Sequence, residues 1–181
     1  MKQAKRPLFF WTLLLLYVFA FFLCSAKSGI CQAWTDMTIR LLPDSSFAGV
    51  EITKGKKIRH CPHHDVNGRL DVEQLIYVLG TFDNERWIDQ KNREAARKHL
   101  TRHYDKFITK TEKQGLHGPV NINHATLTQL VALPQVGPVL AVKIVAYRKS
   151  VSSFETIEQI KKVEGIGAAT FNAIKYYISI K

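Results

Sequence analysis

The chain has 181 residues, 46% of them hydrophobic, and its 26 Lys and Arg outnumber its 15 Asp and Glu, for a formal net charge of +11. This composition excludes a wholly disordered chain, and the length allows one good core or two small ones. The positive charge favours an anionic partner, either nucleic acid or an anionic membrane surface. Excess lysine that only aids solubility is the alternative.

The N-terminus has the pattern of an export signal. Three basic residues within the first six precede an apolar run from Leu8 to Leu23. This order predicts a secretory signal peptide, and the small residues that follow favour cleavage after Ala26. The run is also near the shortest length that spans a bilayer, so an uncleaved anchor over residues 8–23 is the alternative. We therefore expect residues 1–26 to be a signal peptide or membrane anchor. The remainder is then secreted or periplasmic, or anchored to the inner membrane facing outward.

Two cysteines would remain after cleavage, Cys31 and Cys61. A pair of cysteines in an oxidising compartment predicts one disulfide. This bridge would close a loop of about 30 residues and contribute about 3 kcal/mol.

The region 27–108 is expected to be mostly helical, with loops. Turn signals in residues 27–62 predict a loop with one short strand around Phe47–Ile52. Apolar spacing after Asp71 predicts a helix capped by that residue, and a second helix is expected over residues 89–107. The polar segment 109–118, with two glycines, is predicted to be a linker.

The last unit, residues 119–181, contains an internal repeat. The copies Leu127–Arg148 and Ile157–Lys175 each have the pattern of a short helix, a glycine-containing hairpin and a second helix. Each copy is too small to fold singly, so we predict that the two pack into one tandem helix-hairpin-helix core. The fold class is therefore mainly α.

The hairpins have features of a phosphate-binding site. The first N–H groups of a helix lack intrahelical partners, and glycine lets the backbone approach a ligand closely. The second hairpin is expected to donate from Gly165, Gly167, Ala168 and Ala169 around an inward-pointing Ile166. The first is expected to donate from Gly137 and Val139 beside Val136, because Pro138 lacks an N–H. Basic side chains near the hairpins complete the predicted DNA phosphate-binding set: Lys143, Arg148, Lys161 and Lys162. Contacts of this kind carry little sequence information.

These segments resemble a known family. The stretches 120–126, 133–138, 144–148, 154–160 and 163–167 are similar to the C-terminal domain of ComEA-type competence proteins. The resemblance implies a helix-hairpin-helix fold and a secreted or membrane-anchored receptor that holds double-stranded DNA during bacterial transformation. It does not extend to residues 27–118. One departure is Gln135, where the family has glycine. If that position requires a positive φ, glutamine is strained there.

A metal site is the main alternative use of the region 60–103. His60, Cys61, His63 and His64 lie close together in the sequence, and His99 and His103 are one helical turn apart, so they could ligate zinc. Cys61 already has a disulfide candidate, and histidines are common in basic surfaces. We therefore expect no metal and no cofactor, although the sequence leaves metal binding by these histidines open.

The sequence thus favours an exported, non-enzymatic, double-stranded DNA-binding protein that acts as a receptor in DNA uptake, together with other uptake or pilus components. No catalytic set is recognisable in the sequence. One alternative is an extracytoplasmic scaffold that uses the same fold without DNA, which the degenerate Gln135 would favour. Another is an exported nuclease, which would need a metal site within residues 60–103.

Overall fold

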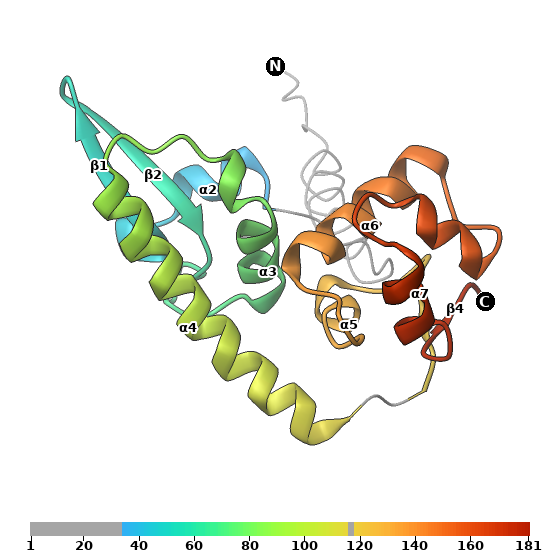
Figure 1. The fold of residues 1–181 in the computed structure, drawn as a ribbon. Helices are drawn as coiled ribbons and strands as arrows, with labels where there is room; N and C mark the ends of the chain where they lie inside the picture. The colour runs from blue at the N-terminus through green and yellow to red at the C-terminus, as the bar shows by residue number, and fades with distance from the viewer. Residues whose placement is uncertain (1–33, 116–117) are drawn as a thin grey trace, which may run out of the picture.

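The computed structural model describes residues 34–115 and 118–181, which form two lobes (Figure 1). The expected signal peptide or anchor and Cys31 lie outside the described residues. Within those two ranges, none of the helices combines the length and apolar character that a bilayer crossing requires.

The N-terminal lobe, residues 34–115, combines helices with a β-hairpin. In chain order its elements are α2 (Asp36–Leu41), the 3-10 helix η1 (Asp44–Ser46), β1 (Phe47–Thr53), β2 (Lys56–Pro62), α3 (Val72–Gly80), the 3-10 helix η2 (Phe82–Asn84) and α4 (Gln90–Gln114). The C-terminal lobe, residues 118–181, contains β3 (Val120–Asn121), α5 (Leu127–Leu130), α6 (Pro138–Val151), the 3-10 helix η3 (Ile157–Lys162), α7 (Ala168–Ile174) and β4 (Ile178–Ser179). The mainly α fold is confirmed.

The hairpin β1–β2 is antiparallel and is joined by a two-residue turn. Lys54 and Gly55 both have positive φ, at 46° and 73°, as a tight hairpin turn of matching twist requires. The expected strand around Phe47–Ile52 is present. The second strand, Lys56–Pro62, was expected to be loop, and that expectation is wrong.

Both predicted helix starts of this lobe are confirmed. The Asp71 side chain accepts a hydrogen bond from Gln74 N at 2.9 Å, and the Asp89 side chain accepts one from Lys91 N at 2.7 Å. These caps satisfy N–H groups that the helix itself leaves without partners. The end of α4 differs from expectation, because the helix continues to Gln114 and ends at Gly115. The first six residues of the expected linker 109–118 are therefore helical.

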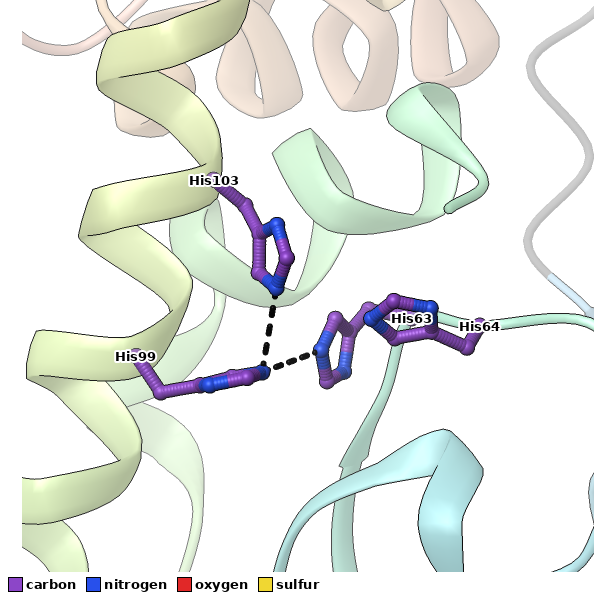
Figure 2. Close-up of side chains that lie close together, drawn as sticks. All are labelled: His63, His64, His99 and His103. Atoms are coloured by element: carbon purple, nitrogen blue, oxygen red, sulfur yellow. Dashed lines mark hydrogen bonds between the residues drawn. The ribbon is translucent and has the colours of Figure 1, made fainter. Parts of the chain in front are cut away.

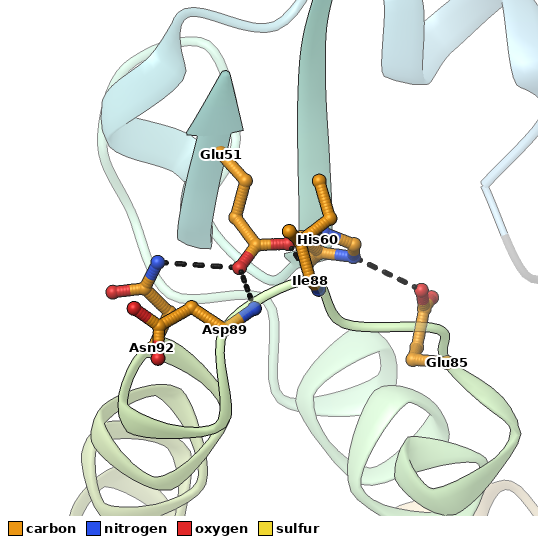
Figure 3. A network of polar contacts seen from close by, with 6 residues as sticks. All are labelled: Glu51, His60, Glu85, Ile88, Asp89 and Asn92. Carbon is orange, nitrogen blue, oxygen red and sulfur yellow. Dashed lines mark hydrogen bonds and ion pairs between the residues drawn. The ribbon is translucent and has the colours of Figure 1, made fainter. Parts of the chain in front are cut away.

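A buried carboxylate joins the hairpin to the start of α4 (Figure 3). Glu51 accepts hydrogen bonds from Ile88 N and Asp89 N, both at 2.9 Å, and also contacts Asn92 and His60. Burial alone would raise the pKa of Glu51, but these donors outweigh it and lower the pKa to about 2. The charged form of Glu51 is thus part of the folded lobe.

Cys61 is 1% exposed and lies in the core of the N-terminal lobe. Burial, and then the nearby Glu85 carboxylate, raise the pKa of its thiol to about 12. Because Cys31 lies outside the described residues, the Cys31–Cys61 disulfide remains a prediction.

The C-terminal lobe closes on itself through a short parallel strand pair. Val120 N donates to Tyr177 O at 2.7 Å, and Ile122 N donates to Ser179 O at 2.9 Å, which ties the beginning of the lobe to its end. The side chains of both sequence repeats then share one core, whose fully buried members include Leu127, Leu130, Ala141 and Ile144 of the first copy and Ile160 and Ile174 of the second. This confirms that the two copies pack together.

The two lobes are packed against each other through α3, which lies beside α5 and α6 (Figure 1). Ile76 of α3 is fully buried in the C-terminal core. The Glu73 carboxylate accepts hydrogen bonds from the N–H groups of Leu127 and Thr128, both at 2.9 Å, and so caps α5 from the other lobe. A Cβ on Gly80 would come within 2.6 Å of the Pro138 carbonyl oxygen. The end of α3 in the N-terminal lobe therefore packs closely against the start of α6.

Candidate nucleic-acid interface

The second hairpin, residues 163–168, presents a bare helix start. Gly167 is the N-cap of α7 and supplies no capping side chain. The first helical hydrogen bond in this helix runs from Phe171 N to Gly167 O, so the N–H groups of residues 168–170 precede the hydrogen-bond ladder. Gly165, Gly167, Ala168 and Ala169 are all exposed. The residues predicted to donate here are thus all at the surface.

The first hairpin, residues 133–138, repeats this geometry. Gly137 is the N-cap of α6 with φ −90° and ψ −178°, and Gly167 has φ −89° and ψ −174°. Val139 is 48% exposed, while Gly137 and Pro138 are half-buried. Because Pro138 has no N–H, this hairpin offers fewer donors than the second.

Gln135 is held in the left-handed region, with φ 62°, and its counterpart Gly165 has φ 92°. The sequence predicted backbone strain at Gln135 if this position requires a positive φ. The structure shows a positive φ there. A residue with a Cβ occupies this conformation at a cost of about 1–2 kcal/mol. The first hairpin thus has the same turn as the second, although glutamine adopts a positive φ less readily than glycine.

Val136 and Ile166, which were included in the phosphate-binding set, are anchors of the hairpins. Their side chains are 4% and 3% exposed. Their N–H groups donate to the carbonyls of Leu133 and Val163, at 3.2 and 3.0 Å. Because those donors are already used inside the turns, neither N–H is left for a phosphate. The inward position expected for Ile166 is confirmed, and Val136 takes the same place in the first hairpin.

Arg148 was also predicted to contact phosphate, and the structure contradicts this. The residue is 6% exposed, and its guanidinium donates to the carbonyl oxygens of Ile122 and Ala125, at 3.0 and 2.8 Å. These carbonyls belong to the loop between β3 and α5. Arg148 therefore ties α6 to that loop inside the lobe.

The three lysines of the predicted set remain near the second hairpin. Lys143 of α6 forms an ion pair with Glu164 at 3.1 Å, and Glu164 itself is 87% exposed. Lys161 lies over the Phe171 ring, 5.0 Å from its centroid, and Lys162 is exposed. Lysine heads at these positions can supplement amide donors without specifying a base.

Glu164 is a functional neighbour that the sequence reasoning missed. It stands directly before Gly165, so an exposed negative charge lies at the hairpin that is expected to face phosphate. The sequence feature that could have identified Glu164 is its position directly before Gly165. Lys143 partly compensates the charge, at an exposed site where such a pair is worth only about 0–1 kcal/mol.

The histidines considered for zinc lie in the N-terminal lobe. The structure brings His63, His64, His99 and His103 together. It places His60 elsewhere, stacked on Trp87 with its ring nitrogens 3.1 Å from Glu51 and 3.3 Å from Glu85 (Figure 3). No element of the two hairpins contributes to this cluster.

Comparison with known proteins concerns the C-terminal lobe. The pattern of the helix-hairpin-helix motif family matches residues 117–179. Over this region the chain is 50% identical to ComE operon protein 1 of Bacillus subtilis (strain 168), across 62 residues that make up 34% of this chain and 30% of that protein.

More distant similarity links the chain to the endonuclease/exonuclease/phosphatase family domain-containing protein 1 of Xenopus laevis and of Homo sapiens. The identities are 38% and 36% over 61 residues, or 34% of this chain, and cover 11% of each of those proteins. The chain thus matches less than a third of the length of any of these relatives. No solved structure matches it. Residues 117–179 are therefore a helix-hairpin-helix domain, and over this region the chain is similar to ComE operon protein 1.

Proposed function

We propose that the protein binds double-stranded DNA through its phosphates without reading base sequence. The observation that carries this proposal is the repetition of one bare, glycine-capped helix start in two hairpins of a helix-hairpin-helix domain. A single such turn would be weak support, since glycines also make tight turns between helices. Two such turns, with N-cap angles that agree within a few degrees, are stronger support than one.

The chemistry of the hairpins suits a binding protein rather than an enzyme. Backbone amides and lysine ammonium groups hold a phosphate, but they supply neither a nucleophile nor a general base. Over residues 119–181 the seven Lys and Arg exceed the three Glu, which gives a net charge of +4. This excess favours a polyanion such as DNA, and the binding should weaken steeply as salt rises.

The setting proposed for this binding is DNA uptake outside the cytoplasm. Its support is the basic and apolar pattern of residues 1–26, together with the 50% identity to ComE operon protein 1. The proposal includes a receptor role for incoming DNA, with other uptake or pilus components as partners. A scaffold that uses the fold without DNA is the competing function, and it would not require exposed donors at either hairpin.

The test is a set of charge substitutions at the two N-caps. Gly137 and Gly167 have ordinary φ values, and a Cβ at either position would meet nothing within 4 Å. Both positions therefore have room for a Cβ, and glutamate there places a carboxylate where a phosphate is expected. Binding is measured by fluorescence anisotropy on a plain duplex, with the protein from residue 27 onward.

We expect Gly167→Glu to raise Kd by about tenfold or more, equivalent to about 1.4 kcal/mol. Gly137→Glu should raise it less, because the first hairpin has fewer exposed donors. Met37→Glu is the matched control: it makes the same charge change at a residue of α2 that is 76% exposed. Equal effects of all three variants would show general charge repulsion and contradict a hairpin site. Circular dichroism verifies that each variant is folded.

A further inference from the structure

Four histidine side chains converge in the N-terminal lobe (Figure 2). They are separate from the two helix-hairpin-helix turns of the C-terminal lobe. His63 and His64 follow directly after β2, and His99 and His103 lie one turn apart on α4. The Nε2 atom of His99 is 2.9 Å from Nε2 of His63 and 3.2 Å from Nε2 of His103. One ligand atom from each of the four rings lies within 4.8 Å of the others.

We propose that these four histidines bind a divalent transition-metal ion, with zinc as the ion that fits best. Imidazole nitrogen is a preferred ligand of Zn²⁺, Ni²⁺ and Cu²⁺, whereas Mg²⁺ and Ca²⁺ require oxygen. In a tetrahedral zinc site with Zn–N distances near 2.0–2.1 Å, two ligand nitrogens are about 3.3 Å apart. The two Nε2 separations at His99 are close to that value, so modest rotation of the rings would open the site around an ion.

The hydrogen bonds behind two of the rings point their free nitrogens toward the cluster. His63 Nδ1 is 3.0 Å from the Cys61 carbonyl oxygen, and His64 Nδ1 is 2.9 Å from the Gly68 carbonyl oxygen. A carbonyl oxygen only accepts, so each Nδ1 must carry the hydrogen, and in a neutral ring Nε2 then has a lone pair. A backbone carbonyl that holds the outer nitrogen of a histidine is the usual support of a metal-bound ring.

The contacts around His99 are difficult to satisfy without an ion. Its Nε2 lies within hydrogen-bond distance of two other Nε2 atoms, yet this nitrogen carries one hydrogen at most. If it donates to His63, it cannot also accept from His103, and if it accepts from His103, its lone pair faces that of His63. A cation that accepts lone pairs from all the rings removes this conflict.

Burial favours the neutral form in three of the four rings. His63 is fully buried, and burial, with smaller contributions from the neighbouring histidines, lowers its pKa to about 4. Burial is also the largest cause of the lowered pKa of His99 and of His103. Neutral imidazole is the metal-binding form.

The ion would have a structural role in this position. It would connect the loop after β2 to the middle of α4, and that loop leads into Asp71, the cap of α3. Helix α3 in turn carries Glu73, which caps α5 of the helix-hairpin-helix lobe. Four protein ligands fill a tetrahedral shell, whereas a catalytic zinc keeps one position for water or substrate. The set contains no carboxylate, which further separates it from a nuclease centre that uses magnesium.

The test uses the protein from residue 27 onward, purified without a polyhistidine tag and stripped with a chelator. Titration with Co²⁺ should give one equivalent per chain and the visible ligand-field absorption of a tetrahedral site, and Zn²⁺ should displace it. Zn²⁺ should also raise the Tm. His99→Ala and His103→Ala should each weaken binding at least about a hundredfold, since removal of even outer-shell partners costs 10–100-fold. His124→Ala, at an exposed histidine of the other lobe, should bind as the wild type does.

A measurement on the wild-type protein avoids any effect of the variants on folding. Nitrogen NMR of the seven histidines should show Zn²⁺-dependent shifts at the ring nitrogens of the four clustered residues and not at His60 or His124. Absence of stoichiometric binding at micromolar metal would overturn the proposal. So would wild-type affinity in the doubly substituted His99→Ala, His103→Ala protein, or zinc shifts confined to histidines outside the cluster. None of these outcomes depends on DNA binding.

Discussion

The strained backbone of the first hairpin makes a quantitative prediction for Gln135→Gly. Gln135 has φ 62°, a conformation that costs a residue with a Cβ about 1–2 kcal/mol. Glycine removes this cost but has more conformational freedom to lose on folding, which offsets about 0.5–1 kcal/mol. We therefore expect Gln135→Gly to increase the free energy of unfolding by about 0.5–1 kcal/mol. Gly165, at the same position of the second hairpin, shows that glycine fits this turn.

Urea denaturation measures this change as a higher midpoint with an unchanged m-value. Gln135→Ala is the matched control, because it removes the same exposed side chain but keeps a Cβ and therefore the backbone strain. It should leave the midpoint nearly unchanged. Equal stabilisation by alanine and glycine would refute the reasoning, since the side chain rather than the backbone angle would then be the cause.

Three further predictions follow from individual contacts. Arg148→Met should lower the free energy of unfolding by about 2–3 kcal/mol, because it leaves two buried carbonyls without donors; an unchanged urea midpoint with weaker DNA binding would instead identify Arg148 as a phosphate contact. Glu164→Gln should tighten DNA binding a few-fold at low salt, because it removes an exposed negative charge beside the second hairpin; weaker binding, measured by anisotropy, would contradict a phosphate site at this hairpin. The pKa of Glu51 falls from 4.5 to about 2 on folding, so the stability it contributes is fully present above pH 4.5 and is lost as the pH falls toward 2. Glu51→Gln should be less stable at pH 7 and should flatten the acid limb of a stability-versus-pH curve, whereas an unchanged acid limb would show that this carboxylate is not its source.

Features with local causes were predictable from the sequence. Asp71 and Asp89 cap helices with their own side chains, and the cap contacts lie within three residues. The two hairpins were recognisable because glycines at fixed spacing repeat beside the same apolar pattern. The strained position of Gln135 followed from the resemblance, because the family has glycine at that position.

Features that depend on distant segments could not be predicted in this way. Strand β2 lacks apolar alternation because one of its buried side chains, His60, pairs with the buried Glu51 of β1. Arg148 was indistinguishable from the neighbouring Lys149, since its burial depends on a loop some 23 residues earlier in the chain. The four clustered histidines come from two segments that only the packing of α4 against the end of the hairpin brings together.

The most direct test of the central claim is the salt dependence of DNA binding by the wild-type protein, measured on two duplexes of equal length and unrelated sequence. Phosphate contacts through the two hairpins predict the same Kd for both duplexes at every salt concentration. They also predict a linear fall of log K with log salt, with a slope of about −0.9 for each phosphate contacted. A slope near zero, or no binding at low salt, would contradict the account, and a preference for one duplex would show that the protein reads bases.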